Sequence, residues 1–297
     1  MDGDTLLVGS IPLTTPAEAL EVFGGPLGPH LASLPDGEVG FRQFWITRVH
    51  FQVLAIHPDL EVIQRPRRDD GIERIYAHDA SDNWNFRVRE GVEKVVFGHP
   101  GWRLGFYQEA LNSYHVFKML KQQGKLPAHL RFQVSIPAAV SALPPRVFPA
   151  PGDLAKVRPG YIDAVRAEVQ AILEHIPPSE LAIQWDCSSE LQDAYGQVAG
   201  LPPEGMIERN LPQIHALSHD LPEEGCWAFT CALAPWAAGR ASSRTAPTGP
   251  WSSPTPSSRA QGGGWTGCIS PSSTARTTPI TPRWRVCGPI RPGSSWA

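Results

Sequence analysis

The sequence predicts an α/β protein in which strands alternate with crossover helices. Over the first 224 of the 297 residues, short apolar runs are separated by segments with helical apolar spacing. The clearest runs are RFQVSIP at 131–137 and LAIQWD at 181–186. Strand, helix, strand and helix in this order favour a parallel sheet. Repetition over this length favours a (β/α)8 TIM barrel; because we count about six strands where a closed barrel has eight, we expect an incomplete one.

The N-terminal segment predicts two strands and two helices. TLLVGSIP (5–12) is a candidate buried strand, and the helix after it begins near Pro16. LASLPDGEVG (31–40) predicts the second strand. Helical apolar spacing over 41–58 predicts a helix that ends at Pro58.

The middle of the chain continues the alternation. EKVVFGHPGW (93–102) is a candidate for a further strand. Residues 104–127 predict a helix closed by Gly124 at its C′ position. After the strand at 131–137 we expect a proline-rich loop to about Pro159, and then an amphipathic helix over 160–178.

Two further elements follow the strand at 181–186. Residues 203–222 predict a helix that is interrupted at Pro212. EEGCWAFTC (223–231) begins in the manner of a strand.

Polar residues at the expected strand ends are the candidate site. Asp36 and Glu38 lie one residue apart, so on a strand they face the same way and suit a cation or a proton relay. The alternative is a turn with solvated acids. Arg42 and Trp45 are suited to a carboxylate or phosphate of a ligand, and surface packing explains them equally well. Ser10 is a candidate ligand donor or an ordinary turn residue.

The strand at 181–186 contributes the remaining candidates. Asp186, with Gln184 on the same strand, is expected to point into the barrel mouth and to bind an amino group through a charge-assisted hydrogen bond. The alternative for Asp186 is an N-cap of the next helix. Cys187, beside Asp186, is a candidate nucleophile or zinc ligand, but we expect an inert buried thiol. Glu190 is a candidate for a second polar group of the mouth, but we expect it on a helix surface.

Four stretches carry a resemblance to a known family: LLVGSIPLTTP, PDGEVGFRQFWI, RFQVSIP and ELAIQWD. In their order and spacing they resemble the superfamily that joins cobalamin-independent methionine synthase and uroporphyrinogen decarboxylase, in particular its small bacterial and fungal members. The resemblance covers about residues 5–224.

The resemblance implies an eight-stranded barrel and, in the methionine-synthase branch, zinc-dependent chemistry. There a thiol substrate is activated on zinc and takes a methyl group from a folate or corrinoid donor. The Asp motif comparable to IQWD helps hold the amino-acid substrate. The next strand ends in His-x-Cys, which supplies two zinc ligands. The corresponding stretch here, 225–239, contains Cys231 but no histidine, so we expect this chain not to bind the family's zinc.

The composition changes abruptly at Gly225. Residues 1–224 carry a formal charge of −10, from 19 Lys and Arg against 29 Asp and Glu. The 73 residues from Gly225 onward contain seven Arg and no Asp, Glu, Lys or His, together with six of the ten Trp. Leu, Ile, Val and Phe together number six in this segment.

A shift of reading frame explains this composition. Shifted GC-rich coding DNA yields Arg, Pro, Ala, Gly, Ser, Thr and Trp, and few acidic residues. If the third base of each codon is joined to the first two of the next, Phe229–Thr230 reads His or Tyr and Cys231–Ala232 reads Cys or Arg. The shifted string therefore permits His-Leu-Cys where the resemblance expects His-x-Cys.

A disordered tail and a zinc module are the alternatives for this segment. A genuine disordered basic tail fits the Ser, Pro and Gly content and the scarcity of acids, but not six tryptophans. A zinc module built on Cys226, Cys231, Cys268 and Cys287 has irregular spacing. We therefore expect a partial barrel domain over 1–224 and an out-of-frame, low-complexity, disordered tail over 225–297.

The net charge and the hydrophobic content of the whole chain limit the classes of partner that we expect. A formal charge of −3 and 41% hydrophobic residues give no reason to expect nucleic acid. No stretch approaches the roughly 18 apolar residues of a membrane span, and the N-terminus lacks the features of a secretory signal, so a cytoplasmic setting is expected. The sequence does not indicate an oligomeric state.

These observations lead to three functional hypotheses. The first is a methionine synthase-like methyltransferase acting on a small thiol, inactive in this chain because the zinc-ligand strand is lost. The second is a uroporphyrinogen decarboxylase-like lyase without metal, which needs Arg and Asp around a propionate-sized pocket. The third is a non-catalytic barrel that binds a small molecule.

Overall fold

The fold is described from a computed structural model of the chain. It describes residues 6–8, 10–40, 42, 45–67, 82–99, 101–194 and 204–230. The expected tail over 225–297 therefore lies outside the described residues, except for its first six positions.

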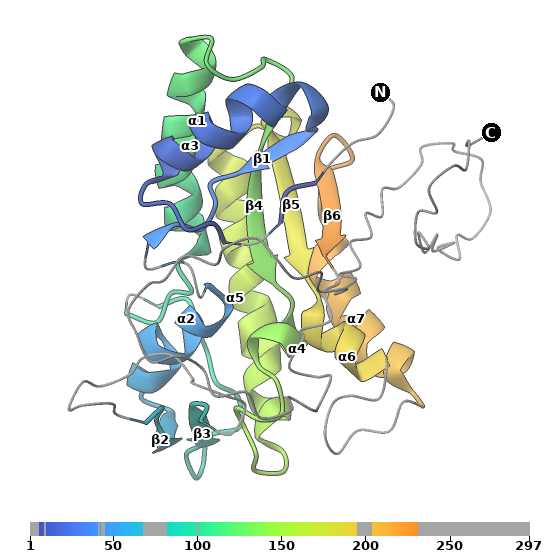
Figure 1. Ribbon diagram of the computed structural model, residues 1–297. Helices are drawn as coiled ribbons and strands as arrows, with labels where there is room; N and C mark the ends of the chain where they lie inside the picture. The colour runs from blue at the N-terminus through green and yellow to red at the C-terminus, as the bar shows by residue number, and fades with distance from the viewer. Residues whose placement is uncertain are drawn as a thin grey trace, which may run out of the picture.

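A parallel sheet forms the centre of the described part, with strand order β1–β4–β5–β6 (Figure 1). The strands are β1 (Ser33–Pro35), β4 (Arg131–Pro137), β5 (Leu181–Asp186) and β6 (Cys226–Thr230). The register places Asp186 between Pro137 and Thr230. The carboxyl ends of β4, β5 and β6 therefore form one edge of the sheet. The mixed α/β class with a parallel sheet is confirmed, and the described strands do not form a closed barrel.

Helices pack against one another along the sheet. They are α1 (Pro16–Leu27), α3 (Phe106–Gln122), α5 (Asp153–His175) and α7 (Met206–Ser218). α1 contacts α3, α3 contacts α5, and α5 contacts α7. Figure 1 shows α5 behind β4 and β5. Each long connection between neighbouring parallel strands thus contains a helix, as parallel pairing requires.

The remaining elements lie beyond the carboxyl end of the sheet or between a long helix and the strand that follows it. They are α2 (Trp45–Gln52), the antiparallel pair β2 (Leu60–Gln64) and β3 (Asn85–Val88), α4 (Ala139–Ala142), α6 (Ser188–Ala194), and 3-10 helices at Gly28–His30, Leu54–Ile56 and Pro178–Glu180.

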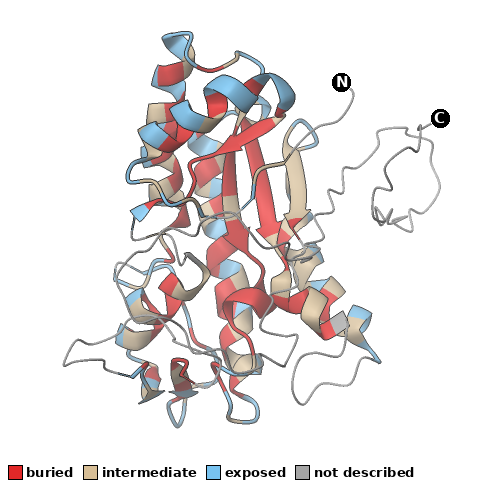
Figure 2. Ribbon diagram, viewed as in Figure 1, coloured by how far each residue is buried: buried red, intermediate tan, exposed pale blue. Residues whose placement is uncertain are grey.

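The alternation of side chains along β4 shows which face of the sheet lies against α3. Phe132 is buried, and its ring lies 5.9 Å from that of Tyr114 and 5.5 Å from that of Phe117, both on α3. Successive strand residues point to opposite faces, so Gln133 and Ser135 point away from α3. Figure 2 shows β4 and β5 as the buried strands and β6 as half-buried. The helix-covered face is apolar, while the opposite face of β4 carries polar groups.

Several predicted elements are confirmed at their boundaries. The strands over 131–137 and 181–186 match β4 and β5, and the segment after Gly225 begins with β6. Pro16 is the first residue of α1, which is capped by the Thr15 hydroxyl accepting from the Glu18 N–H. Gly124 has a φ of +71° one residue beyond the C-cap of α3, as a C′ glycine requires.

Three predicted elements were wrong. The described residues of 5–12 form no strand; the Leu7 carbonyl instead accepts from the side-chain amide of Gln133. No strand lies within the described residues of 93–102. The loop expected up to Pro159 ends at Asp153, because α5 begins there and continues through that proline.

Three further expectations differ in detail. α7 runs through Pro212 without interruption. The helix expected over 41–58 is divided into α2 and a 3-10 turn before Pro58. The hairpin of β2 and β3 gave no recognisable signal, because the two strands are short and distant in sequence.

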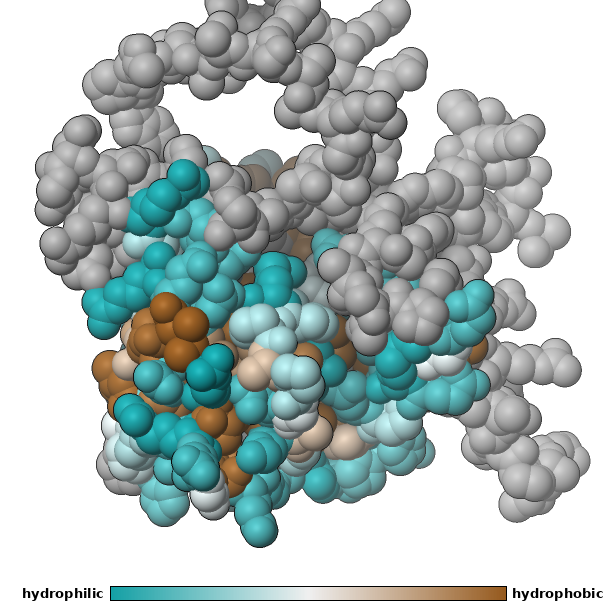
Figure 3. Space-filling view, turned by 90° about the horizontal axis from the view of Figure 1, so that it is seen from below, coloured by the Kyte–Doolittle hydropathy of each residue, from teal (hydrophilic) through white to brown (hydrophobic). Residues whose placement is uncertain are grey.

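The surface of the described part carries scattered apolar side chains. Figure 3 shows hydrophobic groups among hydrophilic ones on the end seen from below. Exposed large hydrophobics on or near the hairpin include Ile56, Ile63 and Val96. Scattered apolar residues are normal on a folded surface. Of the helices in the described ranges, none is long and apolar enough to span a membrane.

Gly160 lies where a neighbouring backbone segment crosses α5. A Cβ at this position would lie 1.8 Å from the carbonyl oxygen of Val95, whose N–H donates to the Lys156 carbonyl. In α1, a Cβ at Gly24 would lie 2.3 Å from the end of the Leu126 side chain. Side-chain ends can rotate away, but a hydrogen-bonded backbone segment cannot.

We expect Gly160→Ala to destabilise the chain by about 3 kcal/mol or more, since overpacking against backbone displaces a whole segment. Gly24→Ala is the matched control and should cost about 1 kcal/mol, because side-chain rearrangement is partly offset by better helix propensity. Urea unfolding of both variants measures the difference. Equal losses of unfolding free energy would contradict the close approach at Gly160.

Candidate functional site

A tight turn follows β1 and carries the two predicted carboxylates. Gly37 has a φ of +77° and Glu38 a φ of +50°, the one positive φ among non-glycine residues of the described part. A Cβ on Gly37 would lie 2.3 Å from the Ile11 side chain. The Asp36 carboxylate accepts from the Glu38 N–H at 3.0 Å. The expectation that both acids sit on a strand was therefore wrong: they lie on a turn, but they are buried rather than solvated.

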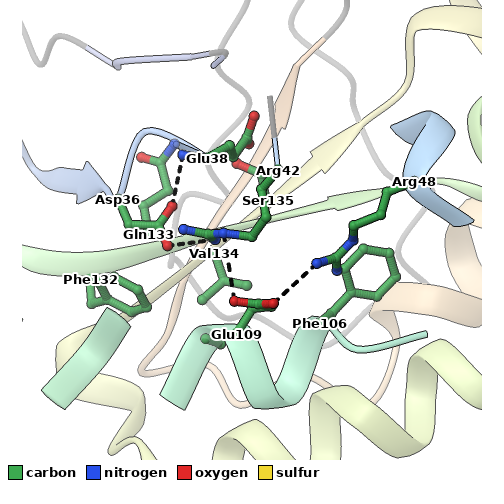
Figure 4. A pocket seen from close by; sticks show the side chains of 11 residues that line it. Asp36, Glu38, Arg42, Arg48, Phe106, Glu109, Phe132, Gln133, Val134 and Ser135 are labelled. Atoms are coloured by element: carbon green, nitrogen blue, oxygen red, sulfur yellow. Dashed lines mark hydrogen bonds and ion pairs between the residues drawn. The ribbon is translucent and has the colours of Figure 1, made fainter. Parts of the chain in front are cut away.

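The turn opens onto a cavity of about 40 Å³ (Figure 4). One wall is formed by the turn and α2, a second by α3 and a third by β4. The lining residues are Asp36, Glu38, Arg42, Arg48, Phe106, Glu109, Ala110, Phe132, Gln133, Val134 and Ser135.

Glu38 is the ionisable group most changed by this environment. Burial raises the pKa of its carboxyl to about 7; hydrogen bonds from Ser10 and Ser135 oppose the rise, and the charge of Asp36 adds to it. The Ser10 hydroxyl donates to the carboxylate at 2.7 Å. A carboxyl group with this pKa can accept or donate a proton near neutral pH.

Two arginines face the same cavity. Arg42 pairs with Asp36 at 2.7 Å, and its Nε lies 3.6 Å from Glu109. Arg48 on α2, which sequence analysis missed, lies 3.3 Å from the other oxygen of Glu109. Burial lowers the pKa of Arg48, and the charge of Glu109 opposes this effect. The cavity therefore has carboxyl groups at the turn and guanidinium groups beside α3.

A row of polar side chains crosses the sheet beneath the cavity. The Ser33 hydroxyl donates to the Gln133 side-chain oxygen at 2.6 Å. The Gln133 amide donates to the Gln184 side-chain oxygen at 2.6 Å and to the Leu7 carbonyl at 2.9 Å. All three polar side chains are buried. Gln184 thus holds Gln133, which lines the cavity, rather than lining it itself.

Asp186 lies on the same edge of the sheet, at the end of β5. Its carboxylate accepts from the Ser188 N–H at 3.2 Å, a contact with the first residue of α6. The N-cap of α6 is Cys187, whose carbonyl accepts from the Leu191 N–H, so the alternative interpretation of Asp186 as the N-cap was wrong by one residue. Burial raises the pKa of Asp186 to about 6; hydrogen bonding to Ser188 opposes the rise, and the charge of Glu190 adds to it. The side chain can bind a ligand cation only in addition to the Ser188 contact.

Glu190 is buried, so the expectation of a helix-surface residue was wrong. Its carboxylate accepts from the Val140 N–H at 3.0 Å and from the Ser141 hydroxyl at 2.6 Å. Burial raises the pKa of Glu190, and these hydrogen bonds oppose the rise. Glu190 thereby fastens α6 to the start of α4, which keeps the carboxyl ends of β4 and β5 together.

The structure brings part of the predicted site together. Ser10, Asp36, Glu38 and Arg42 meet at the cavity or at its edge. Trp45 is the first residue of α2, but its side chain lies outside the described part, as does Cys231.

Four polar lining residues were not predicted from the sequence, and two of them left a signal. Gln133 and Ser135 are polar positions with period 2 in an otherwise apolar strand, which marks a polar face. Arg48 and Glu109 lie on helices, where a single charged residue is indistinguishable from a solvated one.

The donor atoms of the described residues do not form a metal centre. Among these residues, no group of three His, Cys, Asp or Glu side chains is placed to hold a metal ion. The side chain of Cys187 is buried, and its backbone N–H donates to the Thr230 carbonyl. The described donor set therefore does not fit the zinc that the resemblance implies.

The raised pKa of Glu38 predicts a pH-dependent stability. Since the folded state favours the protonated carboxyl, its contribution is fully present below about pH 4.5 and is lost as pH rises through about 7. The loss is on the order of 3 kcal/mol. Glu38→Gln should therefore lose less stability between about pH 4 and pH 8 than the wild-type chain.

Urea unfolding at several pH values measures this difference. Glu61→Gln, at an exposed position of β2, is the matched control and should follow the wild type. The assignment is wrong if Glu38→Gln and Glu61→Gln have the same pH dependence.

Comparisons with known proteins do not extend this description: no family model, no curated protein and no solved structure matches the chain.

Proposed function

We propose that residues 1–224 are the larger part of a methionine synthase-like barrel that binds a small thiol-bearing amino acid at the cavity after β1. The observation that carries the proposal is the 2.7 Å hydrogen bond from Ser10 to Glu38. It joins two of the stretches on which the family resemblance rests, LLVGSIP and PDGEVG, at one polar site.

The topology favours a barrel rather than an open doubly wound sheet. β1, β4, β5 and β6 lie side by side in chain order, without the reversal that defines a switch point in a doubly wound sheet. The connecting helices α3, α5 and α7 contact one another in sequence, as in the outer ring of a barrel. The polar face with Ser33, Gln133 and Gln184 would then be the interior face.

The carboxyl groups of the mouth suit an ammonium group. Glu38 and Asp186 both follow strands of the parallel sheet, and burial holds the pKa of each above its usual range. An arriving ammonium would favour the ionised form of either carboxyl and form a charge-assisted hydrogen bond. Ser10 orients the Glu38 carboxyl for that contact.

The proposal for this chain is limited to substrate binding, because the described residues do not supply a zinc site. A frame shift near codon 225 accounts for the missing ligands. β6 ends at Thr230, which pairs with Asp186. In the shifted reading, His-x-Cys would begin at the codon spanning Phe229 and Thr230 and would thus fall beside Asp186. When bound, zinc would supply activation of the substrate thiol.

A decarboxylase-like lyase is the second candidate, and one observation favours it. Arg42 and Asp36 converge on the cavity, at 2.7 Å from one another. An arginine would hold a substrate carboxylate, and Glu38, with a pKa of about 7, would donate a proton to the carbanion left by loss of carbon dioxide.

We expect the full chain to bind L-homocysteine more tightly than 4-mercaptobutanoate, which differs only in lacking the amino group. Glu38→Gln and Asp186→Asn should each weaken L-homocysteine binding roughly tenfold, because each removes a charge-assisted hydrogen bond. Isothermal titration calorimetry measures these affinities, with Glu61→Gln as the control. Equal affinity for the two thiols would exclude an ammonium site; release of carbon dioxide from a carboxylated substrate would favour the lyase.

We expect the 297-residue chain to hold well below one zinc ion per molecule by elemental analysis, because 225–297 contains no histidine. A gene corrected to the shifted frame at codon 225 should yield a product with about one tightly bound zinc. Sequencing the DNA around codon 225 is the direct control. Stoichiometric zinc in the uncorrected chain would contradict the frame-shift proposal.

A further inference from the structure

Glu109 lies between the two arginines of the cavity. Its carboxylate rises from α3 with one oxygen toward Arg42 and the other toward Arg48 (Figure 4). We propose that Glu109 occupies the place of a ligand carboxylate, and that the carboxylate of a small amino acid displaces it to bind between Arg42 and Arg48. This inference rests on the proposed function only in taking the cavity as the substrate site.

The contacts of Glu109 are loose for ion pairs. They measure 3.6 Å to Arg42 and 3.3 Å to Arg48, whereas Arg42 pairs with Asp36 at 2.7 Å. Charge-assisted N–H···O bonds are usually about 2.7–2.9 Å long. One side chain therefore spans two guanidinium groups without an optimal bond to either, and a free carboxylate could bind both more closely.

Solvent exposure determines which partner can leave. The Glu109 side chain is 39% exposed, while those of Arg42 and Arg48 are 14% and 6% exposed. Glu109 can turn outward and remain hydrated as an ion. The arginines cannot. Arg42 keeps Asp36 as a partner, but without Glu109 the buried Arg48 would lose its ion pair, which is costly. An anion at this position, from Glu109 or from a ligand, is therefore favoured.

Arg48 has donor capacity to spare for a ligand. Its Nε is buried and has no hydrogen-bond partner within the described residues. Glu168, the other acid near Arg48, already accepts from the N–H groups of Gly105 and Tyr107 at the start of α3. A planar carboxylate matches the fork of donors that a guanidinium presents.

The cavity as a whole is bipolar, which selects the ligand class. Asp36 and Glu38 lie at the turn, and Arg42 and Arg48 lie on either side of Glu109. Phe106 contributes an apolar wall beside Arg48 (Figure 4). A small zwitterionic amino acid presents an ammonium to Glu38 and a carboxylate to the two arginines.

Glu109→Gln in the full chain tests the proposal. Without ligand, this variant should melt at a lower temperature than the wild type, because Arg48 loses its counter-charge. Added acetate or glycine should restore the melting temperature of Glu109→Gln more than it raises that of the wild type. By calorimetry the variant should bind either ligand about tenfold more tightly than the wild type.

Two further variants make the result specific. Glu21→Gln removes the exposed 2.7 Å pair with Lys125 and should show no gain in carboxylate binding. Glu109→Asp keeps the charge but shortens the side chain by one methylene, so it should also bind acetate more tightly than the wild type. It serves as the readout if Glu109→Gln does not fold.

The possible results separate the carboxylate site from the proposed function. Unchanged acetate affinity in Glu109→Gln, or an equal gain in Glu21→Gln, would overturn the placeholder role. If Glu109→Gln gained as much affinity for inorganic phosphate as for acetate, the assignment of the site to a carboxylate would be overturned. Tighter acetate and glycine binding, without any preference for a thiol-bearing amino acid, would support the carboxylate site while the proposed methyltransferase-type function fails.

Discussion

Burial of ionisable groups where the chain leaves β1 is the constraint on which the site depends. The turn at Gly37 and Glu38, with positive φ at both positions, places two acids beneath Ile11 and beside Arg42. Taking a carboxylate out of water is costly unless it is paired or protonated. Asp36 is paired with a guanidinium, and Glu38 has a raised pKa and a hydroxyl partner. Two neighbouring acids are thus accommodated in two different ways.

This arrangement depends on elements distant in sequence. β1 supplies the turn, α3 supplies Glu109, and the polar face of β4 closes the cavity. Gln133 is held from both sides, by Ser33 and by Gln184. Because buried amide groups need partners, this row of hydrogen bonds also sets the register of three neighbouring strands. Sheet register and the shape of the site are therefore consequences of the same contacts.

A second set of hydrogen bonds, distinct from the row through Gln133, supports the carboxyl edge of the sheet. Glu190 accepts hydrogen bonds from the first turn of α4, and the Asp186 carbonyl accepts from the Ala138 N–H. These contacts join the segments that follow β4 and β5. Hydrogen bonds thus tie the carboxyl ends of these two strands to each other. Rigid support keeps catalytic or binding groups in place only where the supporting polar groups are themselves satisfied.

The sequence by itself determined the local elements and the chemical character of the site. Apolar runs located β4 and β5, a proline and a glycine located helix ends, and the residues after β1 marked a polar turn. Only the tertiary structure decided that Glu109 and Arg48 meet that turn, and that Glu190 is buried. The physical reason is that periodicity reports which face of an element is apolar. It does not report which charged residues of distant helices come within a few ångströms of one another, because that depends on how the elements pack.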